Sequence, residues 1–283
     1  MDKTRKIDSK LITETVKKLF IEANINLGQD VICSLQDALA REESPLGRQV
    51  LEKIIDNAEI ARREKMPICQ DTGLAVLFIE IGQDVHIVGG DLRAAAEEGV
   101  RQAYQDGFLR KSVCDPLTRK NTQDNTPAII HVDIVPGDRL KIIAMPKGGG
   151  SENMSAAQML TPASGEEGIK KFVIEKVKQA GANPCPPIIV GVGIGGSLEE
   201  ACVLAKKALL RPVGEANNND DRLAQMEKEL LTSINQLGIG PGGLGGRISA
   251  LTVHIKMLPC HIASLPVAVN IQCHVARHKE TVL

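Results

Sequence analysis

Residues 69–82 read CQDTGLAVLFIEIG, and they separate a helical first part of the chain from a part in which strands and helices alternate. The polar segment CQDTG ends at Gly73, and the run 74–81 that follows is almost entirely apolar. A short apolar run that is rich in β-branched and aromatic residues and closes on a glycine is typical of a buried strand.

The sequence on both sides of this strand predicts a succession of regular elements. Upstream, residues 8–64 are predicted to be helical, because residues such as Leu11, Val16 and Leu19 recur at helical spacing. Downstream, residues 85–88 could return as a hairpin partner of the first strand. Further helices are expected at 91–108, 166–181 (capped by Ser164), 198–210 and 221–237, and further strands at 128–135, 139–145, 188–192, 250–257 and 266–271.

This order of elements predicts an α+β fold, in which a helical N-terminal portion packs on a mixed or antiparallel β-sheet unit. The chain has 283 residues and shows no internal repeat or low-complexity tail. We therefore expect one domain over residues 1–283, with residues 1–64 as a helical subregion.

The composition excludes several classes of protein. Lys plus Arg number 34 and Asp plus Glu number 35, so the net charge of -1 gives no electrostatic footprint for nucleic acid. There is no Trp and only one Tyr, which argues against base stacking. The N-terminus lacks the apolar core of a signal peptide, and no stretch reaches the roughly 18 apolar residues of a membrane helix. We expect a cytoplasmic protein with no membrane partner.

The seven cysteines are the first place to look for chemistry, because cytosolic thiols are reduced, metal-bound or buried. Cys33 and Cys202 lie inside amphipathic helices and are predicted to be small buried side chains. Cys69, Cys185 and Cys273 lie at joints between elements, where thiolates can converge on one metal site. Their spacing matches no local ligand motif, so Cys114 and Cys260 stay as competitors at this point.

Other polar positions each allow a structural and a functional interpretation. Asp71 can close a turn by accepting backbone N–H groups, or act in chemistry. Arg110 follows a helix and can be a solvated charge, or a bidentate ligand for a carboxylate. The glycines at 148–150 can form a flexible turn, or present N–H groups to an anion. His261 can be structural, or a proton carrier.

The segment 191–196, GVGIGG, formally fits the glycine pattern of dinucleotide-binding proteins. That fold also needs a second strand ending in an acidic residue about 20 positions later, but a helix fills this interval. Close packing of the backbone explains these glycines better than a nicotinamide cofactor does.

Four motifs together resemble the class I fumarases and the related tartrate dehydratases. They are CQDTG at 69–73, KGGGS at 147–151, CPP at 185–187 and HIAS…VNIQC at 261–273, and the match runs in order from about residue 60 to the C-terminus. The resemblance implies a [4Fe–4S] cluster on Cys69, Cys185 and Cys273, with one iron not ligated by cysteine.

The resemblance also implies roles for the residues around the cluster. Asp71 would help to remove a proton from the substrate, and His261 would act near it. Gln70, Arg110 and Gly150 would contact a small dicarboxylate. An iron without a protein ligand would act as a Lewis acid toward the substrate hydroxyl.

Single-chain members of this family continue into a second domain, whereas this sequence ends ten residues after Cys273. The resemblance therefore implies an alpha subunit whose site is completed by a separate beta subunit, in an (alpha-beta)2 heterotetramer. We expect hydration of fumarate to (S)-malate, because KGGGSENMS at 147–155 resembles the fumarase version more closely. L(+)-tartrate dehydration is the alternative, and a non-catalytic metal-binding assembly module is a second one.

Overall fold

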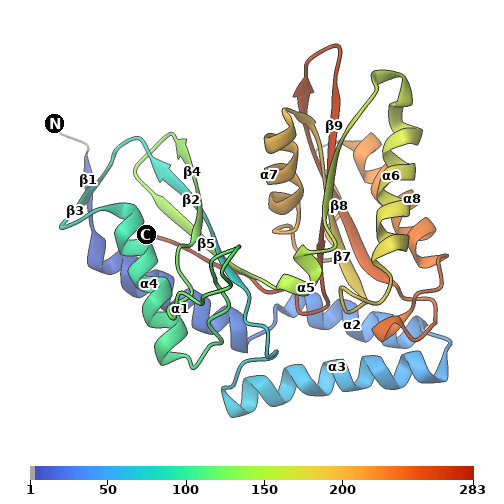
Figure 1. Cartoon of the computed structure of the whole chain (residues 1–283), viewed down its shortest axis with the longest axis horizontal. Helices are drawn as coiled ribbons and strands as arrows, with labels where there is room; N and C mark the ends of the chain where they lie inside the picture. Colours follow the sequence, from blue (N-terminus) through green and yellow to red (C-terminus); the bar gives the residue numbers. More distant parts are fainter. Residues whose placement is uncertain (1–3, 219) are drawn as a thin grey trace. The chain divides into compact units, whose positions relative to one another are not determined.

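The computed structural model of the chain describes residues 4–218 and 220–283, and it divides into two compact units (Figure 1). The expected α+β class is confirmed. The prediction of a single domain over 1–283 stays a prediction. The first unit holds the described residues up to Leu27, with Ala58–Gly149 and Arg277–Leu283, and the second holds those of Gly28–Asn57 and Gly150–Ala276.

The first unit is built on the strand predicted at residues 74–81. This strand, β2, is central in a four-stranded sheet of order β10-β5-β2-β4. It pairs in parallel with β4 and antiparallel with β5, so the sheet is mixed, as expected. The strands are β2 (Leu74–Gly82), β4 (Ile129–Val135), β5 (Leu140–Lys147) and β10 (Lys279–Val282).

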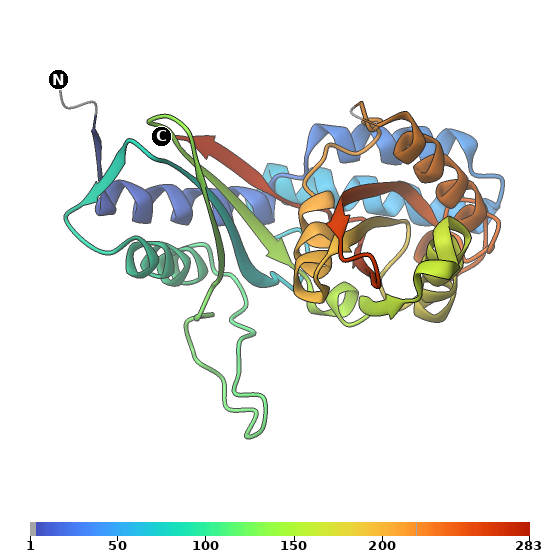
Figure 2. The same ribbon diagram turned by 90° about the horizontal axis from the view of Figure 1, so that it is seen from above.

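Two helices, α1 (Ser9–Ile25) and α4 (Leu92–Asp106), pack on this sheet (Figures 1 and 2). Leu77 and Ile79 of β2 meet Phe20 of α1 in one core. Complete burial of each such side chain contributes about 1.5–3 kcal/mol. The core therefore fixes β2, and with it the start of the strand at Leu74.

The hairpin expected at residues 85–88 is wrong. The strand β3 (Val85–Val88) pairs in parallel with β1 (Arg5–Asp8) instead of returning along β2. The N–H groups of Gln83 and Asp84 donate to the carbonyls of Val135 and Gly137. These bonds tie the chain after β2 to the turn beyond β4, and so exclude the tight turn of a hairpin.

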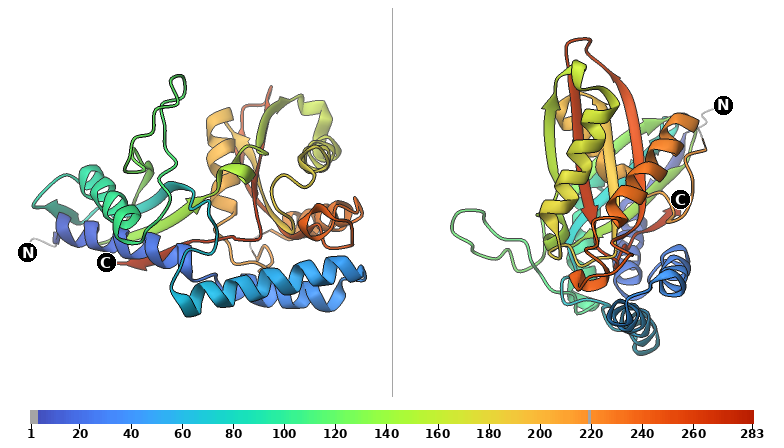
Figure 3. Two further views of the ribbon diagram at one scale, coloured as in Figure 1. Left: turned by 60° about the horizontal axis from the view of Figure 1, so that its bottom comes forward. Right: turned by 90° about the vertical axis from the view of Figure 1, so that its right-hand side faces the viewer.

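The second unit has its own four-stranded sheet, of order β6-β9-β7-β8. The helix α7 packs on one face, while α6 and α8 share a core with the other (Figures 1 and 3). The elements are β6 (Ala156–Leu160), α6 (Gly165–Ala180), β7 (Ile188–Gly196), α7 (Leu198–Ala208), α8 (Asp221–Asn235), β8 (Ala250–Cys260) and β9 (Leu265–Gln272). Ser164 occupies the N-cap of α6 but makes no side-chain capping bond, so the cap expected from the sequence is wrong.

The helices predicted within residues 8–64 are present, with α2 (Gln29–Arg41) and α3 (Pro45–Glu64) following α1. Glu42, just after α2, is 2% exposed and accepts N–H groups from Ser44, Arg247 and Ile248. This carboxylate therefore fastens the end of α2 to the segment before β8. None of the helices within the described residues has the length and apolar character needed to cross a membrane.

Candidate functional site

The CQDTG segment forms a turn that is closed by the Asp71 carboxylate. One carboxylate oxygen accepts the N–H of Gly73 at 2.9 Å, and the other accepts the N–H of Gly149 at 2.7 Å. Gly149 begins the short helix α5 (Gly149–Glu152). The structural interpretation of Asp71 is therefore correct, and it leaves room for the functional one. A carboxylate has about four lone-pair positions, and these two bonds use only half of them.

The last position of this turn, residue 73, requires glycine. Its φ is +80°, in the left-handed region that favours glycine. A Cβ atom there would lie 2.7 Å from the backbone nitrogen of Lys147 and 2.9 Å from the carbonyl carbon of Pro146. The turn is thus pressed against β5, and this contact fixes the position of Asp71.

Buried side chains hold the same turn from behind. The Tyr104 hydroxyl donates to the carbonyls of Thr72 and Gly73, both at 2.8 Å, and the Asn125 amide also donates to Gly73. Burial raises the pKa of Tyr104 above its ordinary value, so its hydroxyl stays a donor at neutral pH. The sequence analysis missed both residues, because a tyrosine in a helix and an asparagine in a polar loop carry no pattern.

Arg110 is joined to the turn through its backbone. The Thr72 hydroxyl donates to the Arg110 carbonyl at 2.9 Å, and the Arg110 side chain is exposed. The structure therefore brings the CQDTG segment together with Arg110, which lies 38 residues after Thr72. The guanidinium is accessible to solvent, and its planar set of N–H donors is suited to binding a carboxylate.

Arg277 is a third residue of this region that the sequence did not predict. It is 3% exposed, and its Nη2 donates to the Asp71 carbonyl. Its Nε and Nη1 find no hydrogen-bond partner among the described residues. A buried arginine with open donors is unusual, because removing a charge from water without pairing it is costly. It places a positive charge directly behind the CQDTG turn.

Cys69 and Gln70 open the turn. The Cys69 thiol is partly exposed and donates to the Gln70 side-chain oxygen at 3.3 Å. The preceding residue, Ile68, is buried, and its N–H donates to the Asn24 carbonyl at 2.9 Å. The chain is thus anchored on both sides of these two side chains.

In the glycine run, the N–H of Gly149 donates to the Asp71 carboxylate. Gly150 follows it and is exposed. A Cβ atom on Gly150 would meet nothing closer than the Asn183 carbonyl at 3.8 Å. The space beside Gly150 is therefore open, as a contact with a ligand requires.

Cys185 and Cys273 come together in the second unit. Cys185 lies just before β7 and Cys273 just after β9, and these antiparallel strands pair Ile189 with Gln272. The next residue, His274, places its Nδ1 2.9 Å from the Cys185 carbonyl. Cys185 is exposed and has a φ of +57°, which turns it away from the strand.

Cysteine thiolates are the usual ligands of iron–sulfur clusters, so Cys69, Cys185 and Cys273 are chemically suited to hold one. No cysteine in residues 4–218 and 220–283 is joined in a disulfide. Cys69 belongs to the first unit, and the other two belong to the second. Across the same residues, no group of three or more His, Cys, Asp or Glu side chains is gathered to hold a metal ion.

The burial expected for Cys33 and Cys202 is wrong, because the helix faces that carry them are exposed.

His261 lies away from Cys185 and Cys273, the two predicted cluster ligands of its own unit. It follows β8 and precedes β9, whereas Cys273 follows the other end of β9. The eight residues of β9 separate the two by roughly 23 Å at the usual strand rise. His261 is exposed, and its Nδ1 accepts only the N–H of Ala263 at 3.1 Å.

The glycines of β7 serve packing, as the sequence analysis expected. A Cβ atom on Gly191 would lie 2.1 Å from the Ala205 carbonyl oxygen, and one on Gly193 would lie 2.0 Å from that of Ala201. The backbone of α7 therefore rests directly on the strand. No room is left there for a dinucleotide.

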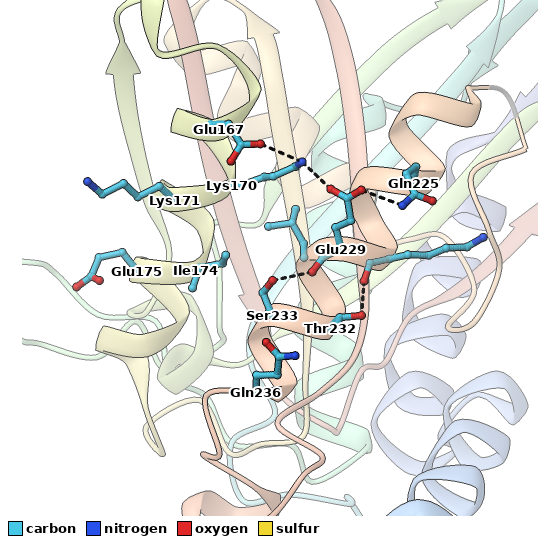
Figure 4. A pocket seen from close by; sticks show the side chains of 12 residues that line it. Glu167, Lys170, Lys171, Ile174, Glu175, Gln225, Glu229, Thr232, Ser233 and Gln236 are labelled. Carbon is cyan, nitrogen blue, oxygen red and sulfur yellow. Dashed lines mark hydrogen bonds and ion pairs between the residues drawn. The ribbon is translucent and has the colours of Figure 1, made fainter.

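A groove of about 790 Å³ runs between α6 and α8, and none of the predicted site residues lines it (Figure 4). Lys170 lies in it with its Nζ 2.6 Å from Glu229 and 2.8 Å from Glu166. Hydrogen bonds to these carboxylates raise the pKa of Lys170. Because the lysine is already neutralised, the groove is a poor receptor for a dicarboxylate.

Comparison with known proteins gives the family. A family model described as "Fumarate hydratase (Fumerase)" matches residues 13–282. The chain belongs to this family. The resemblance of the four motifs is thereby confirmed, and so is the expectation that the protein is a hydro-lyase.

Several curated relatives are named as L(+)-tartrate dehydratase subunits alpha. A Methanocaldococcus jannaschii protein provisionally named L(+)-tartrate dehydratase subunit alpha is 47% identical over 270 residues, or 93% of this chain and 94% of its own. The L(+)-tartrate dehydratase subunits alpha of Escherichia coli K12 and Shigella sonnei are each 34% identical over 266 residues, or 93% of this chain and 87% of theirs.

Proposed function

We propose that this chain is the alpha subunit of an L(+)-tartrate dehydratase. The observation that carries the substrate is the shared name of relatives that align with almost the entire chain. These names favour the alternative of the sequence analysis over its first choice, fumarate. The reaction removes a hydroxyl group from one carbon of the substrate and a proton from its neighbour.

Cys69, Cys185 and Cys273 are the proposed ligands of a [4Fe–4S] cluster. The adjacency of Cys185 and Cys273 supports the proposal, as does the anchored loop that carries Cys69. When bound, a cluster with three thiolate ligands supplies one iron that is open to act as a Lewis acid toward a hydroxyl group.

Asp71 is the proposed base that takes the proton. Its carboxylate is held by two backbone N–H groups and keeps lone pairs for a third partner. Gln70, Arg110 and Gly150 are the proposed contacts of the substrate carboxylates. His261 stays a proposed catalytic residue, and its place beyond the far end of β9 makes it the weakest member of the set.

The partner in this proposal is a beta subunit, since the relatives are named as subunits alpha. We propose an (alpha-beta)2 assembly in which the beta subunit completes the site. The cytoplasmic location expected in the sequence analysis stays part of the proposal.

Hydration of fumarate is the second candidate. The description of the matching family and the segment KGGGSENMS at 147–155 favour it. In the structure, Glu152 of this segment pairs with Lys206 and accepts a hydrogen bond from Asn270. That side chain is therefore structural, and it does not decide between the two substrates.

The test compares substrates on the protein reconstituted anaerobically with iron and sulfide, with and without a beta subunit. We expect faster turnover of L(+)-tartrate than of (S)-malate, and an iron–sulfur absorbance band that is lost in Cys69→Ser, Cys185→Ser and Cys273→Ser. The exposed Cys33→Ser and Cys202→Ser are matched controls that should keep the band. Faster turnover of (S)-malate would select fumarate hydratase, and a protein that binds only zinc and turns over neither would contradict both.

A further inference from the structure

The outer strand β4 leaves an open edge on the sheet of the first unit. It pairs with β2, and no other strand within residues 4–218 and 220–283 pairs with its outer side (Figure 1). The exposed fraction is 72% for Ile134, 44% for Val132 and 38% for Ile129. An exposed apolar edge of this kind is a template for pairing with another strand.

The devices that usually protect an edge are missing from β4. Its sequence, IIHVDIV, contains no lysine and no proline, and its register with β2 runs without a bulge from Ile129 to Val135. Asp133 is its only acidic residue. Edges that stay unpaired normally carry such interruptions, so this strand is suited to having a partner.

The sequence of β4 is complementary to itself when it runs antiparallel. With Val132 opposite Val132 of a second copy, Ile130 faces Ile134, and these pairs lie on one face of the sheet. On the other face, Ile129 meets Val135 and His131 meets Asp133. Every apolar residue then has an apolar neighbour, and the imidazole meets a carboxylate. Such directly opposed pairs are the unit of sheet stabilisation.

Neighbouring registers lack this match. Side chains alternate between faces, so a two-fold pairing can shift only to centres at His131 or Asp133. The first shift sets Ile129 opposite Asp133, and the second sets Asp133 opposite itself. Both also shorten the overlap of the two strands. The register centred on Val132 combines the longest overlap with complementary pairs.

We propose that β4 is an interface with a second copy of this chain, in which two β4 strands pair antiparallel about a two-fold axis at Val132. The two four-stranded sheets then form one continuous sheet. His131 is already held for this contact, because its ring stacks on Phe78 with centroids 4.9 Å apart. Two paired edge strands bury only part of the roughly 1,600 Å² of a standard protein–protein interface. We therefore expect a weak dimer whose population rises with protein concentration.

Disulfide trapping tests the register. Opposed residues of antiparallel strands have Cα atoms about 4.5–5.5 Å apart, within the range for a disulfide. We expect full-length Val132→Cys to form the 132–132 bond under mild oxidation, as mapped by mass spectrometry. Ile134→Cys is the matched control: it is more exposed, but its nearest opposite residue is Ile130. Faster self-crosslinking of Ile134→Cys would show random collision and overturn the proposal.

A charge swap tests the pairing without a new cysteine, by sedimentation velocity over a range of concentrations. His131→Asp sets Asp opposite Asp in both symmetric positions, and we expect roughly tenfold weaker dimerisation. His131→Asp with Asp133→His restores the opposed pairs and should restore the dimer. A double variant as weak as the single one, a wild-type chain that stays monomeric, or a β4 edge that crosslinks to a beta subunit instead would each contradict the proposal.

Discussion

The turn that carries Asp71 and the loop that carries His261 hold the two predicted catalytic residues in opposite ways. Asp71 is fastened by Gly73 and Gly149, and its turn is supported by buried side chains. Within the described residues, the His261 side chain accepts one local hydrogen bond, from the N–H of Ala263, and the next residue, Ile262, is 92% exposed. Preorganisation of a reactive group requires the first kind of surroundings. This difference supports our proposal that the Asp71 turn carries the chemistry of this chain.

The largest effect on stability is expected from Gly73→Ala. The new Cβ meets the Lys147 backbone at a φ of +80°, so we expect a loss of about 3 kcal/mol or more in the free energy of unfolding, measured in urea. Gly137→Ala is the matched control, with a φ of +100° and no atom within 4 Å, and it should lose only about 1 kcal/mol. Equal losses would show that the turn is not pressed against β5.

Glu42 is a second carboxylate that accepts backbone N–H groups, but no catalytic role is predicted for it. The substitution Glu42→Gln therefore tests the structural role alone. We expect a loss of about 2–3 kcal/mol in the free energy of unfolding at pH 7. Glu43→Gln, at an exposed ion pair with Arg247, should lose less than about 0.5 kcal/mol. Turnover by both variants should stay at the wild-type level below the temperature of unfolding.

The stabilisation by Glu42 should also depend on pH. Burial raises its pKa, but backbone N–H donors at Ser44, Ile248 and Arg247 outweigh burial and hold the pKa below its ordinary value of 4.5. The folded state thus binds the proton more weakly than the unfolded state, so the stabilisation is complete above pH 4.5 and is lost as pH falls through the folded pKa. A gap between wild type and Glu42→Gln that widens below pH 4.5 would contradict this sign.

Tyr104→Phe should have a smaller effect. It removes the hydroxyl that donates to the carbonyls of Thr72 and Gly73, of which Gly73 keeps the Asn125 amide as a donor, and we expect a loss of about 1–2 kcal/mol with a lower kcat. Thr232→Val removes a hydroxyl that bonds within an exposed helix, and it should stay within about 0.5 kcal/mol of wild type. An unchanged kcat in Tyr104→Phe would show that the hydrogen bonds from Tyr104 to the CQDTG turn are not needed for catalysis.

His261→Ala should have the smallest effect on stability. The side chain is exposed and has one local contact, so the free energy of unfolding should change by less than about 0.5 kcal/mol. Thermal unfolding measured beside the wild type checks this. A loss above about 2 kcal/mol would mean that the loop is as firmly built as the Asp71 turn.

Much of the fold could be predicted because its long elements carry strong patterns. The apolar run of β2 and the periodic helices α1 and α4 were found from residue spacing alone. The pairing of β3 was not, because hydrogen bonds from Gln83 and Asp84 to a distant turn decide it. The strands β1, β6 and β10 are too short to show an alternation of apolar and polar residues, so the sequence did not predict them.

The candidate site was predictable only in part. Spacing could not choose among seven cysteines, and the family motifs selected three of them. Arg277 and Tyr104 carry no motif, and their importance comes from burial against the CQDTG turn. Exposure of Cys33 and Cys202 depends on which helix face the rest of the unit covers, which local periodicity does not fix.

The most direct test of the account is the turnover number of Asp71→Asn. Asparagine has the same size and keeps one side-chain oxygen, which can accept the N–H of Gly73 or that of Gly149 but not both, and it cannot accept a proton at neutral pH. The reconstituted variant, with its beta subunit and an unchanged iron–sulfur spectrum, should lose a factor of about 10²–10⁴ in kcat. His261→Ala should lose far less. A kcat for Asp71→Asn within a few-fold of wild type would contradict the assignment of the chemistry to the Asp71 turn.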